Sequence, residues 1–280
     1  LWKTTNGGQT WDKISPDLTR HDPKTMGHSG GPITGDMNGP EVYAVIFSIG
    51  PSKRDVNVIW TGSDDGLVHV TKDGGKTWAN VTPKDMPAFG RVSQIDASAF
   101  NTGGAYIAVK RPLMGDNAPY IYKTTDYGKS WTQIINGIRS DDYAHAVRED
   151  PARKGLLYAA TQHGVYYSYD DGANWQSLSL NLPDLPVSDL IVQGSDLAIS
   201  TQGRGFYILD NISPIRQWSD AVASEPEAWL FAPSAALCSP TGASVTSCLK
   251  HPAKNVTNEV LDRAGAGIRN VAPYSSRAPA

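Results

Sequence analysis

Paired carboxylates are the residues of this sequence that could most directly perform chemistry. Asp64 and Asp65 are adjacent in the segment SDDG, and Asp141 and Asp142 are adjacent in RSDDY. Most glycosidases use two acidic groups that face one sugar, one to protonate the leaving oxygen and the other to act as a nucleophile or base. The sequence alone assigns no partner to any of these residues, so they are candidate catalytic groups without assigned roles. Further acidic candidates on predicted loops are Glu41 and Asp116.

A serine nucleophile is suggested by GHSGGP, residues 27–32, which fits the G-x-S-x-G pattern of a nucleophile elbow. An elbow needs a strand before its serine and a helix after it, but Ser29 follows HDPKTM and precedes PITGDMNGP. The segment differs by one residue from the GDSGGP of chymotrypsin-like proteases, whose histidine-centred motif is absent. We therefore interpret residues 27–32 as a glycine-rich loop between structural repeats.

No metal ion and no cofactor are predicted. Adjacent carboxylates in residues 63–66 would suit a hard cation such as Ca²⁺, although a solvated turn explains the same residues. The histidines lack the paired spacing of zinc ligands and are scattered along the chain, at His21, His28, His69, His145, His163 and His251.

The octapeptide TKDGGKTW, residues 71–78, recurs in related form at residues 4–11, 124–131 and 168–175. Its Asp and Thr side chains can hydrogen-bond the backbone of a tight turn, and its glycine can adopt a positive φ. The tryptophan that ends each copy is expected to bury its ring beneath a hairpin. We predict four structural turns rather than four sites, with these rings mostly buried at equivalent places: Trp11, Trp78, Trp131 and Trp175.

Short apolar segments precede the octapeptides in a constant order, as in EVYAVIFSI, NVIWTGS and GLVHVTKDGGKTW. Four short strands in each repeat of roughly 40 to 50 residues are typical of a β-propeller blade. The sequence therefore predicts an all-β fold, a partial ring of about four to five four-stranded blades within residues 1–218. The first blade has only two strands, in residues 1–14, and a degenerate fifth blade extends from Val187 to about Trp218.

The octapeptide is the Asp-box pattern and resembles the repeats of sialidases, of two-propeller xyloglucan-cleaving glycosidases and of sortilin-type receptors. Phrases such as VIWTGSDDGLVHVTKDGGKTW make residues 1–233 similar to the C-terminal part of bacterial exported proteins described as glycosyl hydrolases with BNR or sortilin N-terminal repeats. The resemblance implies an extracellular or periplasmic protein. It also implies either further blades ahead of residue 1 in a longer parent chain or self-association through an open sheet edge.

One face of the predicted propeller should carry the function. The loops between blades, and those between the second and third strands of a blade, gather around the axis, whereas the octapeptide turns lie on the other face. The long loop His21–Glu41 and the insertion Arg111–Tyr120 belong to the axial set and exceed ordinary connector lengths. The predicted ligand-binding residues of this face are Asp64, Asp65, Gln162, His163, Gln202 and Arg204.

Two functions fit these residues. The first is a recognition domain that binds a protein, a peptide or a glycan over the axial face, as sortilin-like propellers do. The alternative is a glycoside hydrolase similar to Asp-box xyloglucanases or sialidases, although the Arg-Ile-Pro element of sialidases is absent. The net charge of −3 and the pI near 6.1 provide no basic surface for nucleic acid, and no apolar run is long enough to span a bilayer.

Residues 219–280 lose the repeat and are rich in Ala, Ser, Pro and Gly, which predicts a largely irregular C-terminal extension. The fragment NEVLDRAGAGIRN resembles the strand-turn-strand start of a small β-sandwich, of which this extension would be a remnant. The two cysteines, Cys238 and Cys248, could form a disulfide in an oxidising compartment or remain reduced. Asn80 and Asn255 begin Asn-x-Thr sequons.

Overall fold

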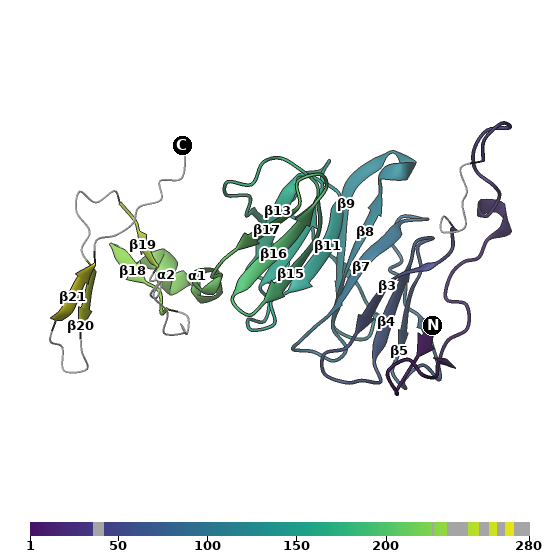
Figure 1. Ribbon diagram of the computed structural model, residues 1–280, viewed down its shortest axis with the longest axis horizontal. Helices are drawn as coiled ribbons and strands as arrows, with labels where there is room; N and C mark the ends of the chain where they lie inside the picture. The colour runs from purple at the N-terminus through teal and green to yellow at the C-terminus, as the bar shows by residue number, and fades with distance from the viewer. Residues whose placement is uncertain (36–41, 226, 234–245, 252–257, 262–266, 272–280) are drawn as a thin grey trace. The chain divides into compact units, whose positions relative to one another are not determined.

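The computed structural model describes the chain apart from residues 36–41, 226, 234–245, 252–257, 262–266 and 272–280 (Figure 1). The chain divides into two compact units, Leu1–Ile208 and Leu209–Ala280, which are described separately below. In the described part of the chain, no helix has both the length and the apolar character needed to cross a membrane.

The first unit is a series of small antiparallel sheets that follow one another along the chain (Figure 1). A two-stranded sheet is followed by three four-stranded sheets and then by a three-stranded sheet. This is the blade architecture of a β-propeller, and the succession of blades is the one that the sequence predicts. The strands are β1 (Trp2–Lys3), β2 (Asp12–Lys13), β3 (Ile46–Pro51), β4 (Ile59–Ser63), β5 (Val68–Thr71), β6 (Ala79–Asn80), β7 (Arg91–Ala97), β8 (Ala105–Arg111), β9 (Asp116–Thr124), β10 (Thr132–Gln133), β11 (Ala144–Glu149), β12 (Leu157–Thr161), β13 (Gly164–Ser168), β14 (Gln176–Ser177), β15 (Val187–Gln193), β16 (Asp196–Thr201) and β17 (Phe206–Leu209).

The first strand of each blade is the innermost, and the successive first strands β3, β7, β11 and β15 contact one another. A β-bulge interrupts the ladder of each of them at the same place, so one residue stands outside the pairing. That residue is Phe47, Ser93, His145 or Ser188 in successive blades. Equivalent backbone positions therefore present an aromatic ring, a hydroxyl, an imidazole and a second hydroxyl.

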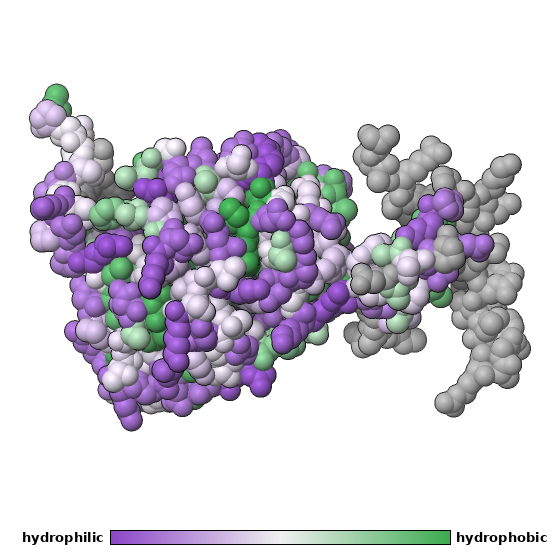
Figure 2. Space-filling model, turned by 180° about the vertical axis from the view of Figure 1, so that it is seen from behind, coloured by the Kyte–Doolittle hydropathy of each residue, from purple (hydrophilic) through white to green (hydrophobic). Residues whose placement is uncertain are grey.

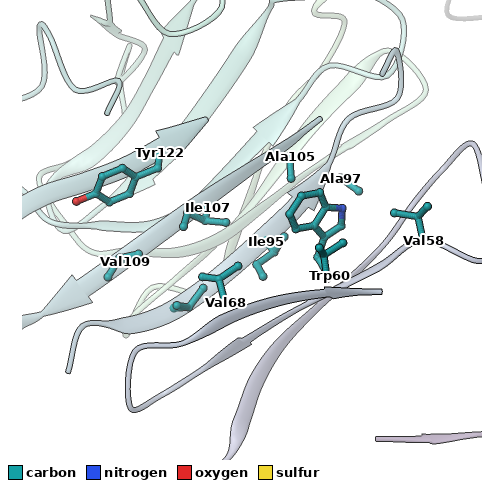
Figure 3. Close-up of a cluster of buried hydrophobic side chains, with 11 residues drawn as sticks. Val58, Trp60, Val68, Ile95, Ala97, Ala105, Ile107, Val109 and Tyr122 are labelled. Atoms are coloured by element: carbon teal, nitrogen blue, oxygen red, sulfur yellow. The ribbon is translucent and has the colours of Figure 1, made fainter. Parts of the chain in front are cut away.

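The hydrophobic core lies between neighbouring blades. Strand β8 illustrates this arrangement. Successive side chains of a strand point to opposite faces of its sheet, so one strand can contribute to the core on both sides. Ile107 and Val109 pack into a cluster with the preceding blade, whereas Tyr106 and Ala108 pack into a cluster with the following blade. Figure 3 shows the first cluster, in which the fully buried indole of Trp60 lies beside side chains of the next blade. A strand that is buried on both faces has the uninterrupted apolar sequence AYIAV seen here.

The octapeptide at residues 71–78 forms a turn that its own side chains close. Asp73 Oδ1 accepts hydrogen bonds from the Thr71 hydroxyl at 2.8 Å and from the Thr77 N–H at 2.9 Å, while Oδ2 accepts from the Thr77 hydroxyl at 2.6 Å. These bonds, chiefly that from the Thr77 hydroxyl, hold the pKa of Asp73 well below its usual range. Corresponding bonds occur in the other copies, at residues 4–11, 124–131 and 168–175.

The tryptophans that end the octapeptides differ in burial. Trp175 is buried and Trp78 and Trp131 are half-buried, but Trp11 is 54% exposed. The prediction of four mostly buried rings is therefore wrong for Trp11. The other three rings reach the blade before their own, whereas the Trp11 indole donates to the carbonyl of Gly8 in its own turn, at 3.1 Å.

Large apolar side chains are exposed on the first and last sheets of the first unit. Trp2 and Val56 are 60% and 74% exposed near the first sheet, and Phe206 and Ile208 are 83% and 62% exposed on the last. By contrast, Ile107 and Ile121 of the middle complete blade are fully buried in clusters between neighbouring sheets. The face drawn in Figure 2 is mostly hydrophilic, with separate hydrophobic areas.

The second unit contains short elements. Strand β18 pairs with β19, and β20 pairs with β21, both antiparallel, so the fragment NEVLDRAGAGIRN includes one of the two pairs. Cys238 and Asn255 lie outside the described residues, so the disulfide and the second sequon stay predictions. The elements are α1 (Ser213–Gln217), α2 (Asp220–Ser224), β18 (Ala228–Leu230), β19 (Ser247–Leu249), β20 (Asn258–Leu261) and β21 (Gly267–Val271).

Candidate functional site

A pocket of about 660 Å³ opens at the strand ends of the first two complete blades, where inner strands begin and second strands end. Two connections also contribute to it, the β2–β3 connection with its 3-10 helix η1 (Pro23–Thr25) and the β8–β9 connection with η2 (Pro112–Met114). The pocket therefore draws on loops of the predicted axial set. Its lining residues are Thr25, Ser29, Tyr43, Asp64, Phe89, Arg91, Lys110, Arg111, Pro112, Leu113 and Met114.

Two cations stand side by side in this pocket. Arg91, at the start of β7, and Lys110, near the end of β8, are direct partners in the antiparallel ladder, and such partners place their side chains on the same face of the sheet. The Arg91 guanidinium carbon lies 4.8 Å from the ring centroid of Phe47, and Lys110 Nζ lies 2.9 Å from Nδ1 of His145. Among the described residues, no carboxylate forms a salt bridge with either cation.

The neighbour of Lys110 is the buried His145, which is bulged out of the β11 ladder. Its Nε2 lies 3.4 Å from Oε1 of Gln162. Burial, and then the charge of Lys110, lower the pKa of His145 to about 4. The imidazole is therefore neutral near pH 7, with its Nδ1 accepting from Lys110 and its Nε2–H directed at Gln162. Burial, and then the charge of Arg91, lower the pKa of Lys110.

Asp64 is the one carboxylate among the described residues that line the pocket. Its Oδ1 accepts from the backbone N–H of Val45 at 2.8 Å, and burial raises its pKa. The adjacent Asp65 is completely buried, and its carboxylate accepts from the Ser63 hydroxyl at 2.5 Å and from the Arg20 backbone N–H at 2.7 Å. Asp65 thus fastens the β2–β3 connection to the blade, and only Asp64 of this pair lines the pocket.

The β8–β9 connection supplies an apolar wall. Arg111 and Asp116 at its two ends form a salt bridge of 2.8 Å, which holds the base of the connection together. Between them, Leu113 is 85% exposed and Met114 is 61% exposed, although both are large apolar side chains. The corresponding connections of the other complete blades, residues 64–67 and 162–163, contain neither a 3-10 helix nor a pair of exposed large apolar side chains, so this wall is particular to one blade.

Four other predicted ligand-binding residues lie in the equivalent turns of later blades. The backbone N–H groups of Gln162 and Gln202 each donate to the residue before the inner strand of their blade, as that of Asp64 does. His163 Nδ1 lies 2.7 Å from a carboxylate oxygen of Asp184, and Arg204 is exposed. None of the four lines the pocket. The structure therefore distributes the predicted set over three blades and places Asp64 alone in the pocket.

The remaining catalytic candidates, Asp141 and Asp142, have different surroundings. Asp142 is completely buried, and its carboxylate accepts from the hydroxyls of Thr161 and Tyr166, both at 3.1 Å. Asp141 is exposed and forms a salt bridge of 2.8 Å with Arg139. Neither residue lines the pocket. Asp142 therefore supports its turn, and Asp141 is part of a surface ion pair.

The pocket includes residues that the sequence analysis did not single out. Tyr43 precedes β3, Arg91 begins β7 and Lys110 lies near the end of β8, all at the same end of the blades as Asp64. This shared position at strand ends is the signal in the sequence that could have identified them. Ser29 lines the pocket as a residue of an irregular loop, which agrees with its interpretation as part of a glycine-rich loop. Glu41 lies outside the described residues.

The sequence of this chain is similar to that of a curated protein. No protein-family model matches the chain. A probable oligoxyloglucan-reducing end-specific xyloglucanase of Neosartorya fischeri is 24% identical over 220 residues, an alignment that covers 61% of this chain and 26% of that protein. The chain thus spans about a quarter of the length of the curated relative that it matches.

The solved structures that are similar to this chain include an enzyme and a peptide-bound protein. An ancestral GH74 enzyme has a TM-score of 0.53 and 15% identity, with 98% of this chain and 36% of that chain covered. The protein YCF48 bound to D1 peptide has a TM-score of 0.46 and 20% identity, with 59% of this chain and 50% of that chain covered. Together with the repeated four-stranded sheets, the likeness to the GH74 enzyme shows that this chain is a β-propeller.

Proposed function

We propose that this protein is an exported β-propeller recognition domain that binds a peptide, a protein or a glycan in the pocket beside Asp64. The observation that carries the proposal is the composition of the pocket. Two cations that form no salt bridge with a described carboxylate, one carboxylate and an apolar wall converge on a volume of about 660 Å³. Concave sites with apolar walls and a few convergent polar groups are typical of ligand recognition.

Binding without turnover is favoured by the acidic residues. A glycosidase needs a second carboxylate across the sugar from the first, and Asp64 has none among the described lining residues. Asp65, its neighbour in sequence, is held by backbone and hydroxyl donors inside the blade. These observations support recognition as the primary proposal.

A second candidate is a glycoside hydrolase in which Asp64 acts as the general acid. Two observations favour it: burial raises the pKa of Asp64, as an acid catalyst requires, and the aligned relative is a probable xyloglucanase. Reducing ends released from xyloglucan and from other plant polysaccharides distinguish the candidates. Hydrolysis that Asp64→Asn abolishes without loss of polysaccharide binding would establish the enzyme and reject recognition as the sole function.

Blocking the pocket tests the primary proposal. A panel of immobilised peptides and oligosaccharides would be screened with the wild-type protein and with Leu113→Glu, which places a charge on the apolar wall without disturbing a core residue. Leu180→Glu is the matched control, because Leu180 is 72% exposed and does not line the pocket. We expect Leu113→Glu alone to lose binding. Equal binding by all three proteins would reject the pocket as the site.

We also propose that residues 1–218 form the propeller region, with residues 219–280 as a C-terminal extension, and that the protein acts outside the cytoplasm. The exposed Trp2 and Val56 near the first sheet support a partner that covers this face, either further blades or a second copy of the chain. Analytical ultracentrifugation of the chain tests the second alternative, which requires a dimer or larger assembly.

A further inference from the structure

The two cations of the pocket, Arg91 and Lys110, repel each other across the pairing of β7 with β8. Like charges that stand directly opposite each other in a sheet destabilise the pairing of the strands. Arg91 and Lys110 are such a pair, and both lie in a partly desolvated position. Their direct partners, Phe47 and the neutral His145, carry no negative charge, and Asp64, the one described carboxylate that lines the pocket, can balance only one of the two positive charges. An anion bound between the two cations would remove this repulsion.

The apolar wall stands beside these cations. Leu113 and Met114 expose most of their surface, and Phe89 and Pro112 line the same pocket. Phe89 also has a φ of 59°, a left-handed conformation that costs energy for a residue with a side chain. The pocket therefore combines a cationic part and an apolar part, so its occupant should have an anionic group next to an apolar group.

We propose that the pocket captures the C-terminal carboxylate of a peptide whose last side chain is apolar. This inference rests on the proposed recognition function and names its ligand class. The Arg91 guanidinium can donate two parallel hydrogen bonds to a carboxylate, and Lys110 can donate a third. The last side chain of the peptide would then pack against Leu113 and Met114.

A monoanion fits this pocket better than a phosphate. Asp64 lines the pocket: burial raises its pKa, and the nearby positive charge of Arg91 acts in the opposite direction. A dianion between the cations would be repelled by the Asp64 carboxylate more strongly than a monoanion. An acidic polysaccharide also fits less well. Its sugars are polar around their edges, whereas the aliphatic and thioether side chains of Leu113 and Met114 pack best against an apolar group.

Fluorescence anisotropy with the full chain tests the inference. The probe is a fluorescein-labelled peptide of sequence Gly-Ser-Gly-Ser-Ala-Leu, made once with a free C-terminal carboxylate and once with a C-terminal amide. We expect the free acid to bind at least tenfold more tightly, and a free acid that ends in Asp to bind as weakly as the amide. Unlabelled oligogalacturonate, xyloglucan oligosaccharide and inorganic phosphate serve as competitors.

Two variants assign the effect to the cations. Arg91→Met and Lys110→Met should each weaken binding of the free acid by tenfold or more and reduce its advantage over the amide. Arg54→Met is the matched control, because Arg54 is exposed and lies outside the pocket. Circular dichroism checks the fold of each variant, and Arg91→Lys, which keeps the charge, should retain part of the preference.

The outcomes separate this inference from the proposed function. Equal binding of acid and amide, or an acid preference that survives both Met variants, would overturn the inference. Tighter binding of either oligosaccharide, lost in Leu113→Glu, would also overturn it while leaving recognition in the pocket intact. Failure of every probe and competitor to bind would reject both proposals.

Discussion

The indole Nε1 of Trp78 donates a hydrogen bond of 2.8 Å to the backbone carbonyl of Ile14, the residue that directly follows β2 of the preceding sheet. The relationship repeats: Trp131 donates to Val81 at 2.7 Å, and Trp175 donates to Ile134 at 2.9 Å. In every case the acceptor lies three residues after the tryptophan of the previous octapeptide. Each octapeptide therefore closes its own turn and also ties its blade to the blade before it.

Replacing one of these indoles should weaken the contact between blades. Trp131→Phe keeps an aromatic ring but removes the donor to Val81, so we expect a loss of about 1–3 kcal/mol in the free energy of unfolding. Trp11→Phe is the control, because the exposed Trp11 bonds only within its own turn. Its effect should stay within about 0.5 kcal/mol in urea titrations. An equal loss of unfolding free energy in Trp131→Phe and Trp11→Phe would show that the hydrogen bond between blades does not contribute to stability.

The second of two left-handed residues should accept only glycine in the turns at residues 71–78, 124–131 and 168–175, where an added Cβ would meet the preceding blade. In residues 71–78 these residues are Gly74 and Gly75, with φ of 74° and 99°. A Cβ at Gly75 would lie 2.6 Å from the carbonyl oxygen of Ile14, whereas a Cβ at Gly74 would have its nearest neighbour at 3.3 Å, a side-chain oxygen. The position of Gly74 is occupied by Tyr127 or Asp171 in later turns.

The two alanine substitutions therefore form a matched pair. Gly74→Ala should lose about 1 kcal/mol for the left-handed conformation alone. Gly75→Ala carries the same conformational cost and adds a steric conflict with a backbone atom, for a total of about 2–4 kcal/mol. Urea unfolding of both variants gives the comparison. A Gly75→Ala variant as stable as Gly74→Ala would mean that the neighbouring blade moves aside easily.

Burial of His145 should make the fold sensitive to acid. Its pKa is about 4 in the folded protein, against an ordinary value of 6.5. Between these values the unfolded chain binds a proton that the folded chain does not bind, so lowering the pH favours unfolding. The stabilising contribution is complete above pH 6.5, is lost as the pH falls toward 4, and amounts to about 3 kcal/mol.

Thermal or urea unfolding across pH 4 to 7 measures this contribution. His145→Gln should flatten the stability curve between these pH values, because its side chain does not titrate. His21→Gln is the control, since the side chain of His21 is 60% exposed beside Asp17. A curve for His145→Gln that parallels the wild type would show that His145 is not the titrating group.

Asparagine should replace the aspartate of an octapeptide turn at little cost. The turn at residues 4–11 already has Asn6, whose Oδ1 accepts from the Thr10 N–H and whose Nδ2 donates to the Thr10 hydroxyl. We therefore expect Asp126→Asn to keep a melting temperature close to that of the wild type and Asp126→Ala to lower it clearly. Because the Ser130 hydroxyl bond lowers the pKa of Asp126 to about 2, the Asn variant should also lose less stability below pH 4. Equal melting temperatures of the two variants would contradict this role.

The sequence predicted the blades because a blade is a local unit. Its strands are consecutive, its turn is closed by side chains of one octapeptide, and its buried strands show continuous apolar runs. The exposure of Trp11 was not predicted, because burial of this ring depends on a neighbouring blade rather than on the octapeptide itself.

The pocket was only partly predictable for a related reason. Asp64 follows the second strand of its blade, and this position was enough to assign it to the correct strand ends. The adjacency of Arg91 and Lys110 depends on the register of β7 with β8, which a bulge between Val92 and Gln94 shifts by one residue. Such a shift changes which side chains share a face, and no periodicity in the sequence reveals it.

The indole-to-carbonyl bond between blades has a consequence for how such chains grow in evolution. The repeats that contain Trp78 and Trp131 each have both the tryptophan that bonds to the preceding repeat and the carbonyl that accepts from the tryptophan of the following repeat. A duplicated gene segment of one repeat length would therefore encode both halves of its own connection. A new blade could then pack against its neighbours without compensating mutations in the older blades. The number of blades could therefore change while the hydrogen bond between neighbouring blades is kept.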